Sequence, residues 1–168
     1  MKKIRGVVLI VKACSSLRVV LAGTRNRRRW KLGKQVFEIL LGGWRNTKSV
    51  LRTKVGGKGK YVKSKKSHRL LKCTRFQRIY LRWRRGRIVV GRQYPDKTRP
   101  GKYKNGRAFL SYAPSRKYRF LISYIYVSAG LRAPALVTIR ECQFSFQQLK
   151  QLSMTRFEVL CGHFHPKS

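Results

Sequence analysis

Acidic residues are scarce in this chain. Only four of its 168 residues are Asp or Glu: Glu38, Asp96, Glu141 and Glu158. General acid and base catalysis often uses two carboxylates that are held together. Four acids scattered along the sequence argue against such a pair, and no catalytic residue is predicted.

The shortage of acids leaves the charge of the chain strongly one-sided. Lys and Arg number 42, so the formal net charge is +38, and most of these cations cannot have an acidic partner within the chain. A field of this kind attracts polyanions. Nucleic acid, an anionic membrane and a sulfated glycan all fit the charge, which does not choose among them.

Long apolar runs are also missing. No stretch approaches the roughly 20 apolar residues of a membrane-spanning helix, so no transmembrane segment is expected. Met1–Lys12 imitates a secretion signal, but Lys12 interrupts its apolar run and no cleavage site follows cleanly. We predict a first β-strand there, and the compartment stays open.

Closely spaced cysteine pairs are absent. The four cysteines, Cys14, Cys73, Cys142 and Cys161, form no Cys-x-x-Cys motif. Their even number permits two disulfides without arguing for them, so the redox compartment also stays open. Cys73 lies near His68 in the sequence, and a free core cysteine beside a surface histidine is favoured there over a nucleophile.

Metal and nucleotide motifs are weak as well. Cys161-x-His163-x-His165 would place three ligands on one face of a strand, with Cys142 as a fourth, but no second cluster with zinc spacing accompanies it. A disordered terminus is favoured, and no metal site is predicted. Gly56–Gly59 follows no convincing strand, and the P-loop motif is absent. We therefore predict no cofactor.

The chain does have enough apolar material for a core, and it repeats a strand pattern. Hydrophobic residues make up 42% of it and aromatic residues 11%, and alternating or β-branched segments recur between turns. The expected strands are Val7–Ala13, Leu17–Ala22, Val36–Leu41, Lys48–Arg52, Phe76–Trp83, Arg87–Gly91, Ala108–Tyr112, Phe120–Val127 and Leu136–Ile139. They predict an all-β fold, an antiparallel β-sandwich-like single domain over residues 7–140.

The segments between these strands have expected structures of their own. Gly86 is predicted to form the turn of a hairpin. Phe120, Ile122, Tyr124 and Tyr126 alternate with a period of two and are predicted to share one face. Three basic segments are expected to be loops: Gly23–Arg29, Gly56–Lys66 and Gln93–Gly106.

Residues 141–168 are expected to form a C-terminal extension of uncertain structure. A short helix is possible there, since five residues lie at helical spacing: Phe146, Leu149, Ser153, Met154 and Phe157. Ser145 is a candidate N-cap for that helix.

The segment Phe37–Arg52 is the most informative part of the sequence. An apolar run reaches Gly42-Gly43-Trp44, crosses a polar connector and returns as Ser49–Arg52, which predicts a strand, a tight turn and a strand. The connector is a candidate element for contacting a ligand or fixing the turn. Its candidate residues are Gly42, Gly43, Trp44, Asn46, Thr47, Lys48 and Ser49.

These segments carry a resemblance to a known family. Phe37–Arg52 is similar to the central signature of the farnesoic acid O-methyltransferase-type domain of animal proteins, and Ile79–Gly91 is similar to its hairpin. Val11–Cys14 looks like the start of that domain, and Ala108–Tyr112 and Ile122–Val127 look like its later strands. The resemblance covers roughly residues 7–128 and implies a β-sandwich-like module. The family name implies methyl transfer to a sesquiterpenoid acid.

Three basic segments interleave aromatic residues with cations: Arg25–Lys31, Lys58–Lys72 and Arg82–Arg92. Cations neutralise phosphates while an exposed aromatic ring stacks on a base. Trp30 is the better stacking candidate, because Trp83 alternates with core positions. The candidate polyanion-binding residues are Arg27, Arg28, Arg29, Trp30, Lys63, Lys65, Lys66, Arg84 and Arg85.

Three functions remain open from the sequence. The favoured one is a binding module whose basic loops take a polyanion, either nucleic acid or a sulfated glycan. The alternatives are a methyltransferase acting on a sesquiterpenoid acid and a basic nucleic-acid-binding protein, for instance one associated with the ribosome. Neither a known nucleic-acid-binding motif nor an oligomeric state can be read from the sequence.

Overall fold

The computed structural model describes residues 6–54, 61–84, 86–116, 119–129, 135–140 and 157–159. The elements within these ranges are β1 (Gly6–Ala13), β2 (Leu17–Ala22), α1 (Arg27–Lys31), β3 (Val36–Gly42), α2 (Gly43–Asn46), β4 (Lys48–Arg52), β5 (Tyr61–Lys66), β6 (Gln77–Arg84), β7 (Arg87–Pro95), β8 (Tyr103–Tyr112), β9 (Tyr124–Ala129), β10 (Ala135–Arg140) and β11 (Phe157–Val159).

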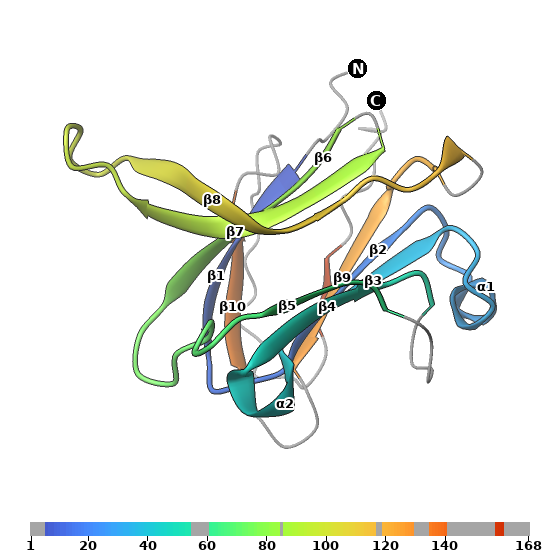
Figure 1. Cartoon of the computed structure of the whole chain (residues 1–168), viewed down its shortest axis with the longest axis horizontal. Helices are drawn as coiled ribbons and strands as arrows, with labels where there is room; N and C mark the ends of the chain where they lie inside the picture. The colour runs from blue at the N-terminus through green and yellow to red at the C-terminus, as the bar shows by residue number, and fades with distance from the viewer. Residues whose placement is uncertain are drawn as a thin grey trace, which may run out of the picture.

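The strands form two antiparallel sheets that face each other (Figure 1). The five-stranded sheet has the order β10-β1-β6-β7-β8, and the six-stranded sheet has the order β11-β9-β2-β3-β4-β5. β1 and β2 follow each other in the chain but belong to different sheets, so the chain crosses between the layers after β1. The predicted all-β sandwich is confirmed.

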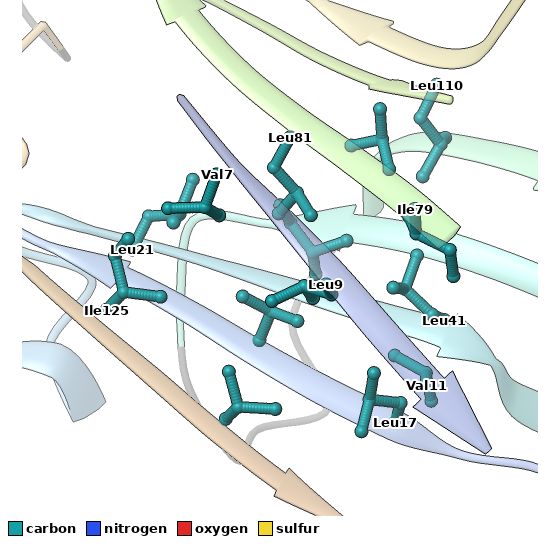
Figure 2. Close-up of a cluster of buried hydrophobic side chains, with 14 of the residues drawn as sticks. Val7, Leu9, Val11, Leu17, Leu21, Leu41, Ile79, Leu81, Leu110 and Ile125 are labelled. Atoms are coloured by element: carbon teal, nitrogen blue, oxygen red, sulfur yellow. The ribbon is translucent and has the colours of Figure 1, made fainter. Parts of the chain in front are cut away.

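The core lies between the two inner sheet faces, where alternate residues of each strand point (Figure 2). Leu9 of β1, Leu21 of β2, Leu41 of β3 and Leu81 of β6 are all fully buried in one cluster. Trp83 packs against this cluster as a partly buried side chain, as its alternation predicts. A period of two in the sequence therefore specifies which side chains meet.

The strand pairs predicted within Phe37–Arg52 and Ile79–Gly91 both form. β3 and β4 are antiparallel, with Ile39 opposite Leu51. β6 and β7 form a hairpin that closes between Arg84 and Arg87, and Gly86 has a φ of +79° there. Glycine enters this left-handed region at little cost.

The expected loop over Gln93–Gly106 is wrong, because β7 continues to Pro95 and β8 already begins at Tyr103. The two strands extend as a ribbon beyond the rest of the sandwich, at the upper left of Figure 1. Proline marks only the end of this ribbon, since Pro95 is the last residue of its strand. Both faces of the ribbon carry polar residues, so its sequence lacks the alternation of apolar and polar residues that predicts a strand.

Asp96 fixes the tip of this ribbon. Its carboxylate accepts hydrogen bonds from the Thr98 hydroxyl at 2.7 Å and the Thr98 backbone N–H at 3.0 Å. Arg99 donates two more, at 3.0 and 2.8 Å. These hydrogen bonds, those from Thr98 first, lower the pKa of the Asp96 carboxyl below its ordinary value.

Two further predictions on local structure are corrected. Arg27–Lys31 is a short helix and not an exposed loop, because the Asn26 side chain caps it. The strand predicted from Phe120 begins only at Tyr124. Phe120 therefore packs against the main core while Tyr126 lies in a second cluster outside it, and the period of two does not extend across that point.

The predicted flexible loop Gly56–Lys66 is also corrected in part. Tyr61–Lys66 forms β5, the edge strand beside β4, while residues 55–60 lie outside the described part. Lysine is common on edge strands because it discourages pairing with another chain. Backbone pairing with β4 thus outweighs the weak strand propensity of the lysine-rich sequence.

The C-terminal strands pair with both sheets. β10 pairs with β1, and β11 pairs with β9. Phe157, placed in the predicted helix, belongs to β11; the other residues of that helix and the Cys142, Cys161, His163 and His165 ligand set lie outside the described residues. The boundary after residue 140 stays a prediction. Within the described ranges, no helix is long and apolar enough to span a membrane.

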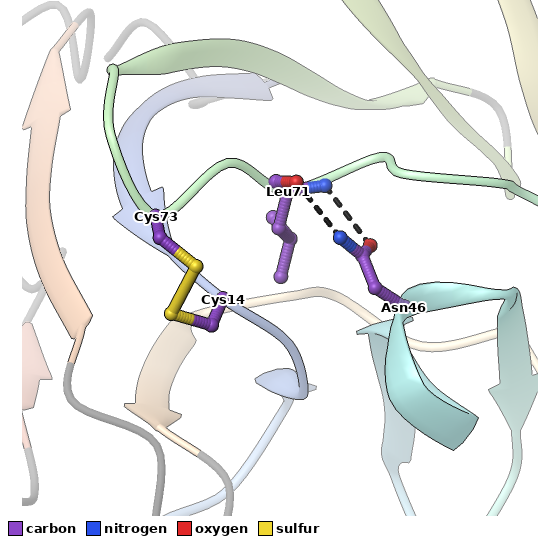
Figure 3. Close-up of a disulfide and its surroundings, with 4 residues drawn as sticks. All are labelled: Cys14, Asn46, Leu71 and Cys73. Carbon is purple, nitrogen blue, oxygen red and sulfur yellow. Dashed lines mark hydrogen bonds between the residues drawn. A yellow bond between two sulfur atoms is a disulfide. The ribbon is translucent and has the colours of Figure 1, made fainter.

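A disulfide joins Cys14, at the end of β1, to Cys73, and this overturns the prediction of a free core cysteine (Figure 3). The two residues are 59 positions apart and their Cα atoms lie 4.4 Å apart. The backbone N–H of Ala13 also donates to the Lys72 carbonyl at 3.0 Å. The antiparallel pairing of β1 with β6, in which Val11 lies opposite Gln77, brings these distant residues together, and no spacing rule reveals it.

Reduction of this disulfide should lower the free energy of unfolding by about 4 kcal/mol, because the bond closes a long loop in the unfolded chain. Guanidinium denaturation with and without reductant measures the change. The double variant Cys14→Ser/Cys73→Ser is the control and should not respond to reductant. An unchanged midpoint of the wild-type chain under reductant would contradict the prediction.

Candidate functional site

The connector between β3 and β4 adopts an unusual backbone. Trp44, Arg45 and Asn46 have φ values of 50°, 55° and 65°, and Gly42 has a φ of 58°. A residue other than glycine costs about 1–2 kcal/mol in the left-handed region. Three such residues in a row persist only where the surrounding structure holds them.

Asn46 provides most of that support (Figure 3). Its side-chain Nδ2 donates to the Leu71 carbonyl at 2.8 Å, and its Oδ1 accepts from the Leu71 N–H at 3.1 Å. The Asn46 carbonyl accepts from the Arg69 N–H at 2.9 Å. The side-chain amide thus pairs with the backbone as a neighbouring strand would, and it ties α2 to the segment that Cys73 anchors.

Ser49 holds the base of the same turn. This residue is fully buried, and its Oγ accepts from the Gly42 N–H at 3.1 Å and lies 2.7 Å from the Ser67 Oγ. The Thr47 hydroxyl donates to the Trp44 carbonyl at 2.6 Å. A Cβ on Gly42 would meet Asn46 and Leu71, and one on Gly43 would meet Leu40.

The turn exposes Trp44, which is 46% exposed, beside Tyr61 of β5, which is 40% exposed. The two rings meet edge to face with centroids 5.7 Å apart. Lys48 Nζ lies 5.2 Å from the Trp44 ring and 4.9 Å from the Tyr61 ring, and Arg52 lies 4.9 Å from Tyr61. Trp44, Lys48, Arg52 and Tyr61 form what we call the Trp44 cluster.

Glu38 offsets the positive charge on one side of this cluster. It is only 2% exposed, and its carboxylate lies 3.0 Å from Arg18 Nε and 3.5 Å from Arg52 Nη1. The other side carries lysines. Lys48 is directly opposite Lys66 across β4 and β5, and like charges in this position destabilise a sheet. Lys63 and Lys65 are exposed on the same edge strand.

Trp30, the predicted stacking residue, is buried at 5% exposure, so that prediction is wrong. Its ring meets Tyr126 edge to face at 4.6 Å, and its Nε1 donates to the Thr24 carbonyl at 2.8 Å. Trp30 docks α1 on the outer face of the six-stranded sheet. The charges around it on α1 (Arg27, Arg28 and Arg29) remain exposed.

The structure brings some predicted residues together and separates others. Val20, packed with α1, is opposite Glu38, and Glu38 is opposite Arg52. The α1 arginines and the Trp44 cluster therefore lie on one outer face. Arg84 is on the other sheet, in the β6–β7 hairpin, and Arg85 lies outside the described residues.

Sequence reasoning missed Arg52 as a site residue and did not pair Tyr61 with Trp44. The available signal was weak: Tyr61 stands in a lysine run, 17 positions after Trp44. Their contact depends on β5 pairing with β4, which the sequence does not predict. Among the described residues, no group of three His, Cys, Asp or Glu could hold a metal ion.

A family model described as farnesoic acid O-methyl transferase matches residues 2–133 of the chain. This range contains the strands β1 to β9 and both helices. No curated protein and no solved structure matches the chain. The predicted resemblance over residues 7–128 is confirmed by the family match.

Replacing Asn46 tests its role in holding the turn. Asn46→Ala should lower the free energy of unfolding by about 3 kcal/mol, since it removes both hydrogen bonds to Leu71 and places alanine at positive φ. Asn46→Gly loses only the hydrogen bonds and should be less destabilising than the alanine variant. Urea denaturation measures both.

Thr47→Ala is the matched control, because it removes one exposed hydrogen bond at a residue with negative φ. It should cost at most about 1 kcal/mol. Equal losses for Thr47→Ala and Asn46→Ala would show that Asn46 has no special role.

Proposed function

Since the chain belongs to the farnesoic acid O-methyltransferase family, and its β-sandwich exposes the Trp44 cluster, we propose that it is a binding module for polyanions. The Trp44 cluster is the observation that carries this proposal. A ligand with anionic ester groups on a polymer backbone fits its chemistry. Both nucleic acids and sulfated glycans are such polymers.

The cluster combines two kinds of contact. The exposed rings of Trp44 and Tyr61 offer flat apolar surface for a base or a sugar ring, and a stacked base is worth about 1–3 kcal/mol. Lys48 lies beside those rings and can neutralise an anionic group, while Arg52, which lies beside Tyr61, is already paired with Glu38. An anion between Lys48 and Lys66 also removes their mutual repulsion.

Neighbouring cations extend this surface in two directions. Lys66 of the edge strand β5 lies opposite Lys48 on this outer face, whereas Lys63 and Lys65 lie opposite the inward-facing Leu51 and Ser49. Arg27–Arg29 lie farther along the same outer face on α1. A polymer contacts several of these groups at once, which favours a chain of anions over a single small anion.

The methyltransferase alternative has less support. A cavity of about 340 Å³ is lined by Arg29, Lys34, Phe37, Arg119 and Phe120 together with Gly33, Gln35, Val36 and Thr53. None of these described residues is acidic, whereas the ribose hydroxyls of a nucleoside cofactor are usually bound by a carboxylate. We expect no heat of binding when adenosyl-methionine is titrated at millimolar concentration. Saturable binding of this compound would favour the enzyme.

Removing the exposed ring and the cation together tests the binding proposal. Trp44→Ala/Lys48→Gln should lower the affinity for a polyanion about tenfold, because a stacking contact and a charge contact are lost. The probes are a heparin-derived hexasaccharide and a single-stranded oligothymidylate, each titrated at several salt concentrations. Preference for one probe distinguishes a sulfated glycan from nucleic acid.

The control variant is Phe76→Ala/Arg75→Gln, which removes an exposed aromatic residue and a neighbouring cation elsewhere. It should change the affinity less than threefold. If both double variants weaken binding equally, attraction by net charge alone explains it, and the Trp44 cluster is not the site.

A further inference from the structure

The outer face of the five-stranded sheet carries a second ordered group of polar side chains. Arg78 and Arg82 of β6 alternate with the buried Ile79 and Leu81, so they point away from the core. Gln93 of β7 is opposite Arg78, and Asn105 of β8 is opposite Gln93. Tyr103 lies at the start of β8.

Contacts within this group hold the side chains in place. The Arg78 guanidinium lies 3.8 Å from the centre of the Tyr103 ring, and its Nε donates to Gln93 Oε1 at 3.1 Å. Gln93 Nε2 donates to Asn105 Oδ1 at 3.0 Å. In the other orientation of the Asn105 amide, its oxygen exchanges this bond for one from Arg82 Nη2 at 2.7 Å, so Asn105 is bonded to one neighbour or the other. A ligand therefore meets side chains that have already lost much of their rotamer freedom.

The surface beneath these side chains is flat and aromatic. The Tyr80 ring lies against Gly91, where a Cβ would collide with it, and its hydroxyl donates to the Gly106 carbonyl at 3.0 Å. Arg82 lies 5.7 Å from the Tyr80 ring. Tyr103, opposite Pro95, is 44% exposed on this face, whereas Tyr94 alternates with Gln93 and points to the other face of the ribbon. Gly91 thus permits the Tyr80 ring to lie close to the backbone.

We propose that Arg78, Arg82, Gln93, Tyr103 and Asn105 form a binding site for a sulfated saccharide. The two guanidinium groups match sulfate oxygens through paired N–H donors. The amides of Gln93 and Asn105 offer both donors and acceptors to sugar hydroxyls. The exposed Tyr103 ring gives apolar surface against which the CH groups of a sugar can pack.

The disulfide favours a sulfated saccharide over nucleic acid at this site. Cys14–Cys73 requires an oxidising compartment to form and persist. Sulfated glycans occur in such compartments, outside the cell or in the secretory system. The site lies on the opposite sheet from the Trp44 cluster, so this inference does not depend on the proposed function of that cluster.

The test uses the full chain carrying Trp44→Ala/Lys48→Gln, so that the first cluster contributes little to the measurement. Arg78→Gln/Arg82→Gln is added, and calorimetry with a heparin-derived hexasaccharide should show at least a tenfold loss of affinity. The control adds Arg87→Gln/Lys97→Gln, which removes two exposed cations outside the group, one at the start of β7 and one at the tip of the ribbon. This control should lose less than threefold.

Two further measurements separate a specific site from charge and from folding. A desulfated hexasaccharide should bind at least tenfold more weakly than the sulfated one. Tyr103→Ser keeps the charges but removes the ring under Arg78, so it should weaken binding about fivefold. Far-UV circular dichroism checks the fold of every variant. If Arg78→Gln/Arg82→Gln misfolds, the affinity of the Tyr103→Ser chain for the hexasaccharide tests the proposal instead.

Three results would overturn the proposal. The first is a loss for Arg78→Gln/Arg82→Gln within threefold of the control. The second is unchanged binding by a folded Tyr103→Ser chain. The third is an oligothymidylate of matched charge that binds as tightly as the hexasaccharide and responds equally to the arginine substitutions, which would show attraction by charge alone.

Discussion

The attachment of residues 67–73 to α2 is the constraint on which the exposed site depends. Cys73 is bonded to the end of β1, and two residues earlier Leu71 is paired with the Asn46 side chain. A covalent bond and backbone hydrogen bonds therefore offset the strain of a left-handed turn. Without them the chain would relax, and the position of Trp44 relative to Tyr61 would be lost. The core of the sandwich holds the sheets together, but it does not determine where Trp44 lies relative to Tyr61.

Scarcity of acids gives individual carboxylates unusual weight. Glu38 lies between Arg18 and Arg52 on the outer sheet face, and Asp96 closes the ribbon between β7 and β8. Glu38 fixes the direction of two guanidinium groups that would otherwise repel one another, and Asp96 fixes that of Arg99. Elsewhere the arginines are ordered by aromatic rings, as Arg78 is by Tyr103. Cation–π contacts thus do locally what ion pairs do in proteins of balanced charge.

Much of the fold could be predicted from the sequence because its inner sheet faces keep a period of two. Ile79, Leu81 and Trp83 stand in clear alternation, and all three lie in or against the core. The strand–turn–strand over Phe37–Arg52 also formed as predicted. This period is absent where side chains are polar on both faces, as in β5 and the ribbon end of β7 and β8, and these parts were not predicted as strands. There the backbone ladder, and not hydrophobic burial, determines the structure.

Only part of the candidate site could be predicted from the sequence. Gly42, Asn46 and Ser49 were recognised within a signature, but their contacts with Ser67 and Leu71 join segments far apart in the chain. Trp30 was predicted to be exposed because its neighbours in the sequence are charged, but its ring packs on the outer face of the sheet. Local sequence reports the polarity of a segment, whereas the exposure of one ring depends on which strands become neighbours.

The lysines of β5 have a second consequence, which concerns association between copies of the chain. Among the residues that the structure describes, β5 is the last strand of its sheet, and one side of its backbone has no partner strand there. A second β5 approaching this side would place lysines against lysines, which opposes strand addition and aggregation. A polyanion bound as we propose would neutralise those lysines and remove the protection. Crowding of such domains along one polymer would therefore favour edge-to-edge pairing that the free protein resists.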